Sequence, residues 1–206
     1  MPNPLITVII PTYNRLDHLR AAVRTVLGQT YRSLELIVVD NNCTDGTDAC
    51  VRRFVREDRR VRHVQEDTQG INPARNRGLS EAHGEWVAYL DDDELTPSHW
   101  LANLMACCRE TGADGAGGGY LALWEGVPPK WLSRSECLKE TVGVVKRGDE
   151  RRPVEWLLGG NCLYRREALE RVGGFGNYVG YRGRGSLADG ADVAVGHRLS
   201  AAGYRL

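Results

Sequence analysis

The sequence predicts an α/β fold in which a mostly parallel β-sheet is flanked by helices. Short β-branched, apolar segments alternate four times with segments of helical periodicity, the pattern of parallel strands joined by crossover helices. Three of the four strands are followed at once by polar residues, as expected where a parallel sheet binds its ligand. A chain of 206 residues can bury the core of one such domain.

The expected elements follow in order along the chain. Strands are expected at residues 5–10, 34–39, 61–65 and 86–90, and Pro11 should stop the first of them. Helices are expected at residues 16–27, 47–56, 72–82 and 96–111; Asn72 and Pro73 are typical of a helix start. With the strand order 3-2-1-4, the three polar strand ends would be neighbours.

Beyond residue 120 the pattern is looser. We expect a strand at residues 161–164, a helix at 165–172, a loop rich in glycine and arginine at 173–190, and a final helix at 192–202. Residues 203–206 resemble the start of another strand, which predicts a truncated C-terminus.

The charge balance argues against nucleic acid as a partner. Lys+Arg and Asp+Glu both total 27, so the net charge is zero, and general electrostatic attraction to nucleic acid or an anionic membrane is absent. No apolar stretch approaches the ~20 residues of a membrane helix. The six cysteines lack metal-ligand spacing and suit free thiols in a reducing compartment. We expect no transmembrane segment and a cytoplasmic location, with peripheral association at the inner face of the membrane left open.

Four consecutive acids, from Asp91 to Glu94, follow the fourth strand. Two carboxylates ~4 Å apart repel by roughly 4 kcal/mol at an effective dielectric constant near 20. A divalent cation would reverse that penalty, and oxygen ligands suit Mg²⁺ or Mn²⁺. The alternative is a solvated acidic turn before a helix N-terminus. The position at a strand end favours metal binding.

Two further residues have both a structural and a ligand-binding interpretation. Asp40 is either a turn residue or an acceptor for a nucleobase imide nitrogen. Arg75 and Arg77 lie near a helix start, where the helix dipole and the guanidinium both favour an anion. Either arginine alone could equally be a surface charge.

Ordered motifs resemble those of glycosyltransferase family 2, the inverting enzymes of the GT-A fold. They are Pro11-Thr12-Tyr13-Asn14-Arg15 and the segments at residues 39–47, 74–78 and 84–94, followed by similar segments at 159–166, 172–175 and 198–204. The resemblance covers almost the whole chain. It implies a Rossmann-like, mostly parallel sheet, with a nucleotide-sugar (donor) half at residues 1–123 and a smaller acceptor-side region with the catalytic base at residues 124–206.

The resemblance also implies roles for individual residues. The donor would be bound by Pro11, Thr12, Tyr13, Asn14, Asp40, Asn42, Arg75, Asp91 and Asp92, and Mn²⁺ or Mg²⁺ by Asp91 and Asp93. Asp192 matches the general base, with Asp189 as the alternative, because Ala191 and Ala194 replace acidic positions of the motif. Without the resemblance, Asp192 would be interpreted as a helix N-cap.

The implied reaction is a metal-assisted, inverting displacement. It would transfer a sugar from a UDP-type donor to a hydroxyl of a glycan or lipid-linked acceptor, in bacterial polysaccharide biosynthesis. Arg182 and Arg184 could belong to a lid over the phosphates, and Trp124, Trp131 and Trp156 could stack on sugars or simply pack. The main rival is a catalytically inactive relative that binds nucleotide as a scaffold. A dinucleotide-dependent oxidoreductase is disfavoured because the first strand is not followed by its glycine fingerprint.

Overall fold

A computed structural model describes residues 3–124, 126–127, 150–176 and 190–206. Trp131, Arg182, Arg184 and Asp189 therefore lie outside the described residues. Within them, six strands form one mixed sheet in the order β3-β2-β1-β4-β6-β5. The strands are β1 (Ile6–Thr12), β2 (Leu34–Asp40), β3 (Val61–Gln65), β4 (Trp86–Tyr89), β5 (Gly115–Gly117) and β6 (Cys162–Arg165). The first four are parallel, so the predicted sheet and the predicted order 3-2-1-4 are confirmed.

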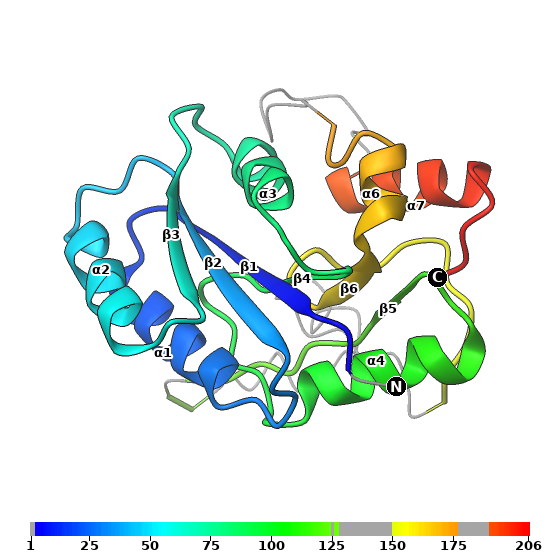
Figure 1. Cartoon of the computed structure of the whole chain (residues 1–206), viewed down its shortest axis with the longest axis horizontal. Helices are drawn as coiled ribbons and strands as arrows, with labels where there is room; N and C mark the ends of the chain where they lie inside the picture. Colours follow the sequence, from blue (N-terminus) through cyan, green and yellow to red (C-terminus); the bar gives the residue numbers. More distant parts are fainter. Residues whose placement is uncertain (1–2, 125, 128–149, 177–189) are drawn as a thin grey trace.

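Helices cover both faces of the sheet (Figure 1). They are α1 (Leu16–Leu27), α2 (Thr47–Glu57), α3 (Ile71–Ser80), α4 (Trp100–Thr111), α6 (Arg166–Arg171) and α7 (Ala191–Ala201). One hydrophobic cluster joins α1, α2 and α4 to one face of the sheet, and a second cluster joins α3, α6 and α7 to the other.

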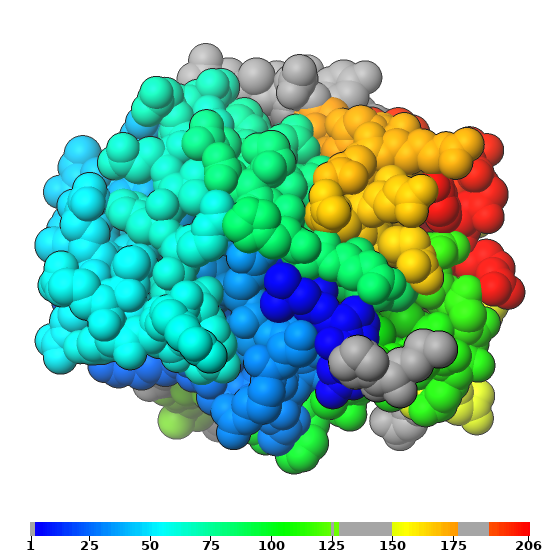
Figure 2. Space-filling model, viewed as in Figure 1, coloured from blue at the N-terminus to red at the C-terminus, as the bar shows by residue number. Residues whose placement is uncertain are grey.

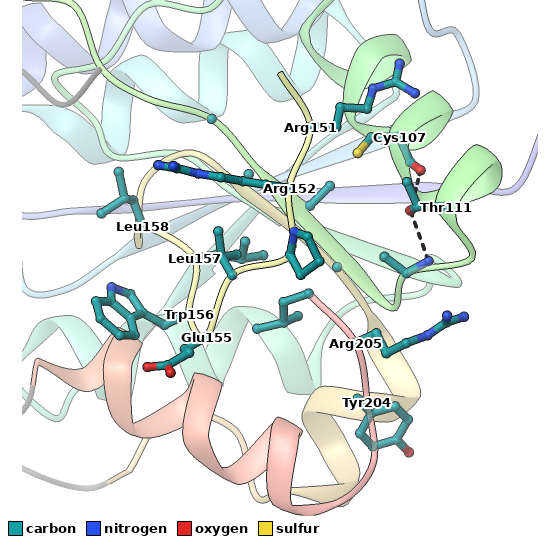
Figure 3. A pocket seen from close by; sticks show the side chains of 18 of the residues that line it. Cys107, Thr111, Arg151, Arg152, Glu155, Trp156, Leu157, Leu158, Tyr204 and Arg205 are labelled. Carbon is teal, nitrogen blue, oxygen red and sulfur yellow. Dashed lines mark hydrogen bonds between the residues drawn. The ribbon is translucent and has the colours of Figure 1, made fainter. Parts of the chain in front are cut away.

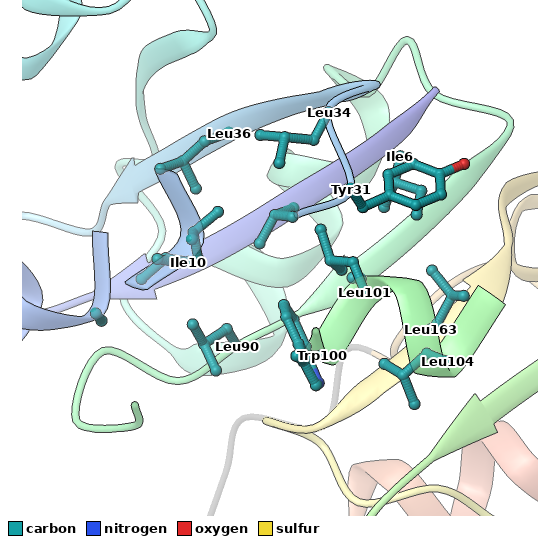
Figure 4. Packing of buried hydrophobic residues seen from close by; sticks show 14 of the residues in the cluster. Ile6, Ile10, Tyr31, Leu34, Leu36, Leu90, Trp100, Leu101, Leu104 and Leu163 are labelled. Carbon is teal, nitrogen blue, oxygen red and sulfur yellow. The ribbon is translucent and has the colours of Figure 1, made fainter. Parts of the chain in front are cut away.

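Successive side chains of the central strands enter opposite clusters, as the two-residue period of a strand requires. Ile6, Val8 and Ile10 belong to the first cluster, whereas Ile9 belongs to the second. Figure 4 shows Leu101 and Leu104 of α4 packed beneath the first of these faces. Because both faces are buried, the strands are nearly continuous apolar runs.

The first strand continues through Pro11, where we expected it to stop. The carbonyl of Ile9 accepts from Leu90 on the β4 side, whereas the carbonyl of Thr12 accepts from Asn41 on the β2 side. Alternation therefore directs the nitrogen of Pro11 toward β4, whose pairing with β1 already ends at Ile9. Proline has no N–H to donate, but no strand-to-strand hydrogen bond is required at this position.

Two helices begin at other residues than expected. Helix α3 begins at Ile71, with Gly70 as its N-cap at φ +143°, so Pro73 lies inside the first turn rather than opening it. Helix α4 begins at Trp100 rather than at Thr96. The fully buried Gln29 binds both the segment before α4 and the first turn of α4. Its amide nitrogen donates to the carbonyl of Pro97, and its amide oxygen accepts the N–H of Leu101.

The edge of the sheet also differs from the expectation. Strand β5 was not predicted, because its three residues, Gly115–Gly117, carry no periodicity. Residues 203–206 form no strand; the carbonyls of Arg205 and Leu206 instead accept from the N–H groups of Asp114 and Val154, at 2.7 and 3.2 Å.

Glu35 organises the amino ends of the strands, opposite the polar strand ends. Its carboxylate accepts hydrogen bonds from the Thr7 hydroxyl at 2.6 Å and from the backbone N–H of His83 at 2.7 Å. Burial alone would raise the pKa of Glu35, but these hydrogen bonds and the neighbouring His83 more than offset it, so its pKa lies below the usual value.

Replacement Glu35→Gln should therefore destabilise the protein at neutral pH by about 1–3 kcal/mol, the usual range for a charged hydrogen-bonded group. An unfolded glutamate titrates near 4.5. The stabilisation should thus be present above that pH and disappear as the pH falls through the lower folded value. Urea unfolding at pH 7, 5 and 3.5 measures the free energy of unfolding of both proteins. The control is Glu57→Gln, a change at an exposed glutamate that pairs with Arg53. A constant difference between wild type and Glu35→Gln across this range would contradict the prediction.

Candidate active site

A cleft of about 460 Å³ opens at the carboxyl ends of the central strands. It is lined by Pro11, Thr12, Tyr13, Arg15, Asn41, Gln69, Gly70, Ile71, Ala74, Asp91, Asp92 and Asp93. Six of the residues singled out in the sequence thus share one cleft: Pro11, Thr12, Tyr13 and the three aspartates. They come from the end of β1 and from the segment after β4, which are adjacent strands.

The three aspartates of the acidic run have different partners. Asp92 is buried and accepts a hydrogen bond from the Thr12 hydroxyl at 2.7 Å. Burial raises the pKa of Asp92, and the Thr12 hydrogen bond opposes that rise. Asp93 is half-exposed and pairs with Arg15, whereas Asp91 faces Arg75 at 3.3 Å. Asp92 is thus a structural anchor, and Asp91 and Asp93 are the more accessible carboxylates.

Arg75 joins two carboxylates that are far apart in the sequence. Its Nη2 lies 3.3 Å from Asp91 Oδ1 and its Nη1 lies 3.1 Å from Asp192 Oδ1. Only 7% of the Arg75 side chain is exposed. The structure therefore brings the predicted base, at the start of α7, next to the predicted metal ligand after β4.

Asp192 has a second partner in the backbone, because its Oδ2 accepts the N–H of Gly159 at 3.0 Å. Burial raises the pKa of Asp192, and Arg75 opposes that rise. A carboxylate with a raised pKa is a stronger base while it is ionised. Among the described residues, each oxygen of Asp192 has one hydrogen-bond partner, so each can accept a further hydrogen bond from a ligand.

Gly159 and Gly160 allow the carboxylates to approach the backbone closely. A Cβ on Gly159 would lie 2.5 Å from the Arg75 guanidinium and 2.7 Å from Asp192. A Cβ on Gly160 would lie 2.5 Å from Glu94 and 2.8 Å from Asp91. The two glycines, which precede β6, are thus part of the site because they have no side chain.

Glu94 was part of the predicted acidic run but was assigned no role. Burial, together with the charges of Asp91 and Asp93, raises the pKa of Glu94 to about 8. The hydroxyl of Tyr120 hydrogen-bonds to Glu94 and accepts the N–H of Gly160 at 3.0 Å. Nothing in the sequence around Tyr120 could have located it beside the acidic run.

Asn14, Asp40 and Asn42 do not line the cleft; they hold the loops around it. Asn14 and Asn42 have positive φ angles of 53° and 67°, which asparagine tolerates better than most residues. Asp40 is buried, and its Oδ1 accepts the N–H of Cys43 at 2.8 Å. The amide of Asn42 donates to the carbonyl of Asp67 at 2.9 Å.

Asn41, between two residues that the motif singled out, was missed. Its amide nitrogen donates to the carbonyls of Glu66 and Thr68, and its oxygen accepts the N–H of Gly70 at 2.8 Å. Asn41 therefore fixes the loop that leads into α3 on one side of the cleft. A buried asparagine that binds two carbonyls in this way is a tertiary contact, which a local sequence pattern does not indicate.

Helix α3 holds Arg75 in place through its neighbours. Asn76 donates to the carbonyl of Phe175 at 2.6 Å and accepts the N–H of the same residue at 2.8 Å. The Phe175 ring lies against the guanidinium of Arg75, at 5.2 Å. Figure 2 shows the surface of α3 beside that of α6. Gly78 lets the helix approach Ile9 of β1, because a Cβ there would collide with the Ile9 side chain.

A larger cavity of about 570 Å³ lies on the other side of the segment that leads to Gly159. Figure 3 shows it between α4, the chain end at Tyr204 and Arg205, and residues 151–158. Leu157 and Leu158 line it, and Trp156 lines it at the α7 end, where its ring meets His197 edge-on at 6.4 Å. Trp124 is 44% exposed and lies outside this cavity.

The oxygen ligands of the cleft fit a hard divalent cation that arrives with a diphosphate. Within the described ranges, no three His, Cys, Asp or Glu side chains are arranged to hold a metal by themselves. Mg²⁺ in proteins is commonly held by one or two carboxylates plus substrate phosphates and water, which Asp91 and Asp93 could supply. The pKa of Glu94 is raised first by burial and then by the charges of Asp91 and Asp93, and a cation beside these carboxylates would offset the second effect.

The sequence also matches known proteins. The model of the family "Glycosyl transferase family 2" matches residues 7–173. The chain belongs to this family. Glycosyltransferase AglE of Haloferax volcanii is 30% identical over 207 residues, which covers 98% of this chain and 64% of AglE.

Two further similar proteins have more specific names. The GalNAc(5)-diNAcBac-PP-undecaprenol beta-1,3-glucosyltransferase of Campylobacter jejuni is 38% identical over 52% of this chain and 35% of its own length. The mannosyltransferase PcManGT of Pyrobaculum calidifontis, solved in complex with GDP-Man and Mn²⁺, superposes with a TM-score of 0.71 at 26% identity, over 99% of this chain and 54% of that one. The GT-A fold expected from the resemblance is thereby confirmed. The chain spans less than two thirds of each of these three proteins.

In the part of the chain that the structure describes, no helix is both long and apolar enough to cross a bilayer.

Replacement Gly160→Ala should force the carboxylates of Asp91 and Glu94 to move. Overpacking of this kind costs about 1–3 kcal/mol, and urea unfolding would measure the loss of stability. Gly126→Ala is the matched control, because a Cβ there meets nothing within 4 Å. Equal unfolding midpoints for the two variants would show that the carboxylates do not pack on Gly160 as described.

Proposed function

We propose that this protein is a glycosyltransferase that moves a sugar from a nucleotide-sugar donor, of the UDP type, to an acceptor hydroxyl with inversion. The observation that carries the proposal is the pairing of Asp91 and Asp192 through the buried Arg75. It joins Asp91, a cleft carboxylate suited to a metal-bound diphosphate, to Asp192, a second carboxylate suited to act as a base. Family membership supports the same reaction class.

The donor would occupy the cleft at the carboxyl ends of β1 and β4. Pro11, Thr12 and Tyr13 would contact the nucleoside, while Asp91 and Asp93 would hold Mn²⁺ or Mg²⁺ on the diphosphate. Asn14, Asp40 and Asn42, which do not line the cleft, would shape the nucleoside pocket from behind by holding its loops. The Pyrobaculum mannosyltransferase, which binds GDP-Man and Mn²⁺, supports a divalent metal at such a site.

The chemistry requires a leaving group and a base. When bound, the divalent cation supplies positive charge to the departing diphosphate. Asp192 would take the proton of the acceptor hydroxyl as the oxygen attacks the anomeric carbon from the face opposite the diphosphate. Its pKa, raised by burial, makes it a stronger base than a solvated aspartate, and the Gly159 N–H and Arg75 orient it.

The acceptor would approach from the side of residues 124–206. The larger cavity and the site share one chain segment. Leu158 lines the cavity, and the next residue, Gly159, donates its N–H to Asp192. The cavity has apolar walls, from Trp156, Leu157 and Leu158, and basic side chains, from Arg151, Arg152 and Arg205. This mixture suits a glycan or a lipid-linked acceptor that carries phosphate. The name of the Campylobacter relative, which includes an undecaprenol diphosphate, supports the lipid-linked alternative. An acceptor of that kind would place the protein at the inner face of a membrane, in polysaccharide biosynthesis.

The rival proposal, an inactive scaffold, has one observation in its favour. Ala191 and Ala194 replace acidic positions beside Asp192. Slow, metal-dependent hydrolysis of UDP-sugars would separate the alternatives, since a scaffold would bind the nucleotide and leave it intact.

Replacement Asp192→Asn should slow sugar transfer and donor hydrolysis strongly while leaving binding of the nucleoside diphosphate intact. General-base catalysis contributes roughly 10²–10⁴-fold, so a loss of that size in kcat is expected. Calorimetric titration with UDP and Mn²⁺ checks binding, and Asp17→Asn, a change at an exposed aspartate of α1, is the control. A variant that retains more than a tenth of the wild-type kcat would exclude Asp192 as the base.

A further inference from the structure

We propose that Arg75 is a positioning residue for Asp192, and that it does not serve as a ligand of the donor phosphates. The inference rests on the proposed function, in which Asp192 is the base. A helix start rich in arginine would suggest an anion site, so the assignment depends on where the guanidinium lies.

Both terminal nitrogens of Arg75 are already directed at protein carboxylates. Nη1 lies 3.1 Å from Asp192 and Nη2 lies 3.3 Å from Asp91. One face of the guanidinium is covered by the Phe175 ring at 5.2 Å. Its Nε is buried, and no hydrogen-bond partner for it is found among the described residues. Arg75 is also absent from the residues that line the donor cleft.

The position of Arg75 is set by packing rather than by a ligand. Its side chain is 7% exposed, and its helix packs on β1 and β2. The two Asn76 hydrogen bonds hold the segment that carries Phe175 against the same helix turn. Tyr89 of β4 packs edge-on against Phe175 at 5.0 Å. The guanidinium is therefore held before any substrate binds.

Such a fixed cation has two consequences for Asp192. It favours the ionised carboxylate at a buried position, where burial by itself favours the protonated form. It also fixes the orientation of the carboxylate, because Arg75 holds Oδ1 while the N–H of Gly159 holds Oδ2. Since the same guanidinium pairs with Asp91, the carboxylate on the donor side and the base are held in one arrangement. Loss of Arg75 should consequently affect the chemical step rather than donor binding.

The test compares Arg75→Gln and Arg75→Lys with Arg77→Gln. Arg77 is the matched control because it lies in the same helix but is exposed, and its side-chain partner among the described residues is Glu81, at 3.0 Å. We expect kcat of Arg75→Gln to fall about 10²-fold, within the range of general-base catalysis, while the donor KM and the affinity for UDP with Mn²⁺ change less than about threefold. Arg75→Lys should recover part of kcat, because it restores the charge without the two-pronged geometry.

Two further measurements distinguish positioning from a general structural effect. The acid limb of the kcat/KM profile should move to higher pH in Arg75→Gln, because Asp192 loses its cation. In a protein that already carries Asp192→Asn, the added change Arg75→Gln should lower activity little further, because Arg75 acts through the base that has been removed. Removal of one partner of a buried ion pair is destabilising. If Arg75→Gln does not fold, the same comparisons are made with Arg75→Lys.

Opposite results overturn the inference. A fall of tenfold or more in affinity for UDP with Mn²⁺, with kcat unchanged, would make Arg75 a phosphate ligand. Additive losses in the double variant, or an acid limb that does not move, would also overturn it. If wild-type protein bound no nucleoside diphosphate and hydrolysed no donor, the proposed function itself would fail, whatever the variants showed.

Discussion

The arrangement of the site depends on one buried guanidinium between two carboxylates. Transfer of charged groups out of water costs several kcal/mol for each ion, and the cost is recovered only with good geometry and further hydrogen bonds. Arg75, Asp91 and Asp192 meet that condition in part through each other and in part through the backbone of Gly159. An arrangement of this kind is a poor source of stability. The arrangement is better explained by function, because Arg75 holds the donor-side carboxylate Asp91 next to the base Asp192.

The sheet brings these groups together through its topology. Strands β1 and β4 are neighbours although α1 to α3 lie between them in the sequence, so their carboxyl ends deliver Thr12 and the acidic run to one edge. Helix α3 crosses one face of that sheet and carries Arg75 toward the same edge. The chain then returns through β6, and the two glycines before it, Gly159 and Gly160, complete the site with backbone instead of side chains.

Much of the sheet and of the donor cleft could be predicted from the sequence, because local residue patterns indicate them. The first four strands follow from apolar periodicity. With the order 3-2-1-4, which the structure has, their polar ends are neighbours, and Thr12 clusters with Asp91 to Asp93. The direction of each side chain could not be predicted. Asp92 turns inward to Thr12, Asp91 turns to Arg75, and Asp40 turns to the Cys43 N–H, because tertiary partners decide these orientations. The roles of Gln29 and Asn41 were missed for the same reason, since each binds backbone groups far along the chain.

The most direct test is a crystal structure of the protein with Mn²⁺ and a nucleoside diphosphate, in which the anomalous signal of manganese locates the metal. The account predicts the metal within coordination distance of Asp91 or Asp93, the nucleoside beside Pro11 to Tyr13, and Arg75 still between Asp91 and Asp192. Manganese and diphosphate bound in the larger cavity, or Arg75 withdrawn from Asp192 to the phosphates, would contradict it.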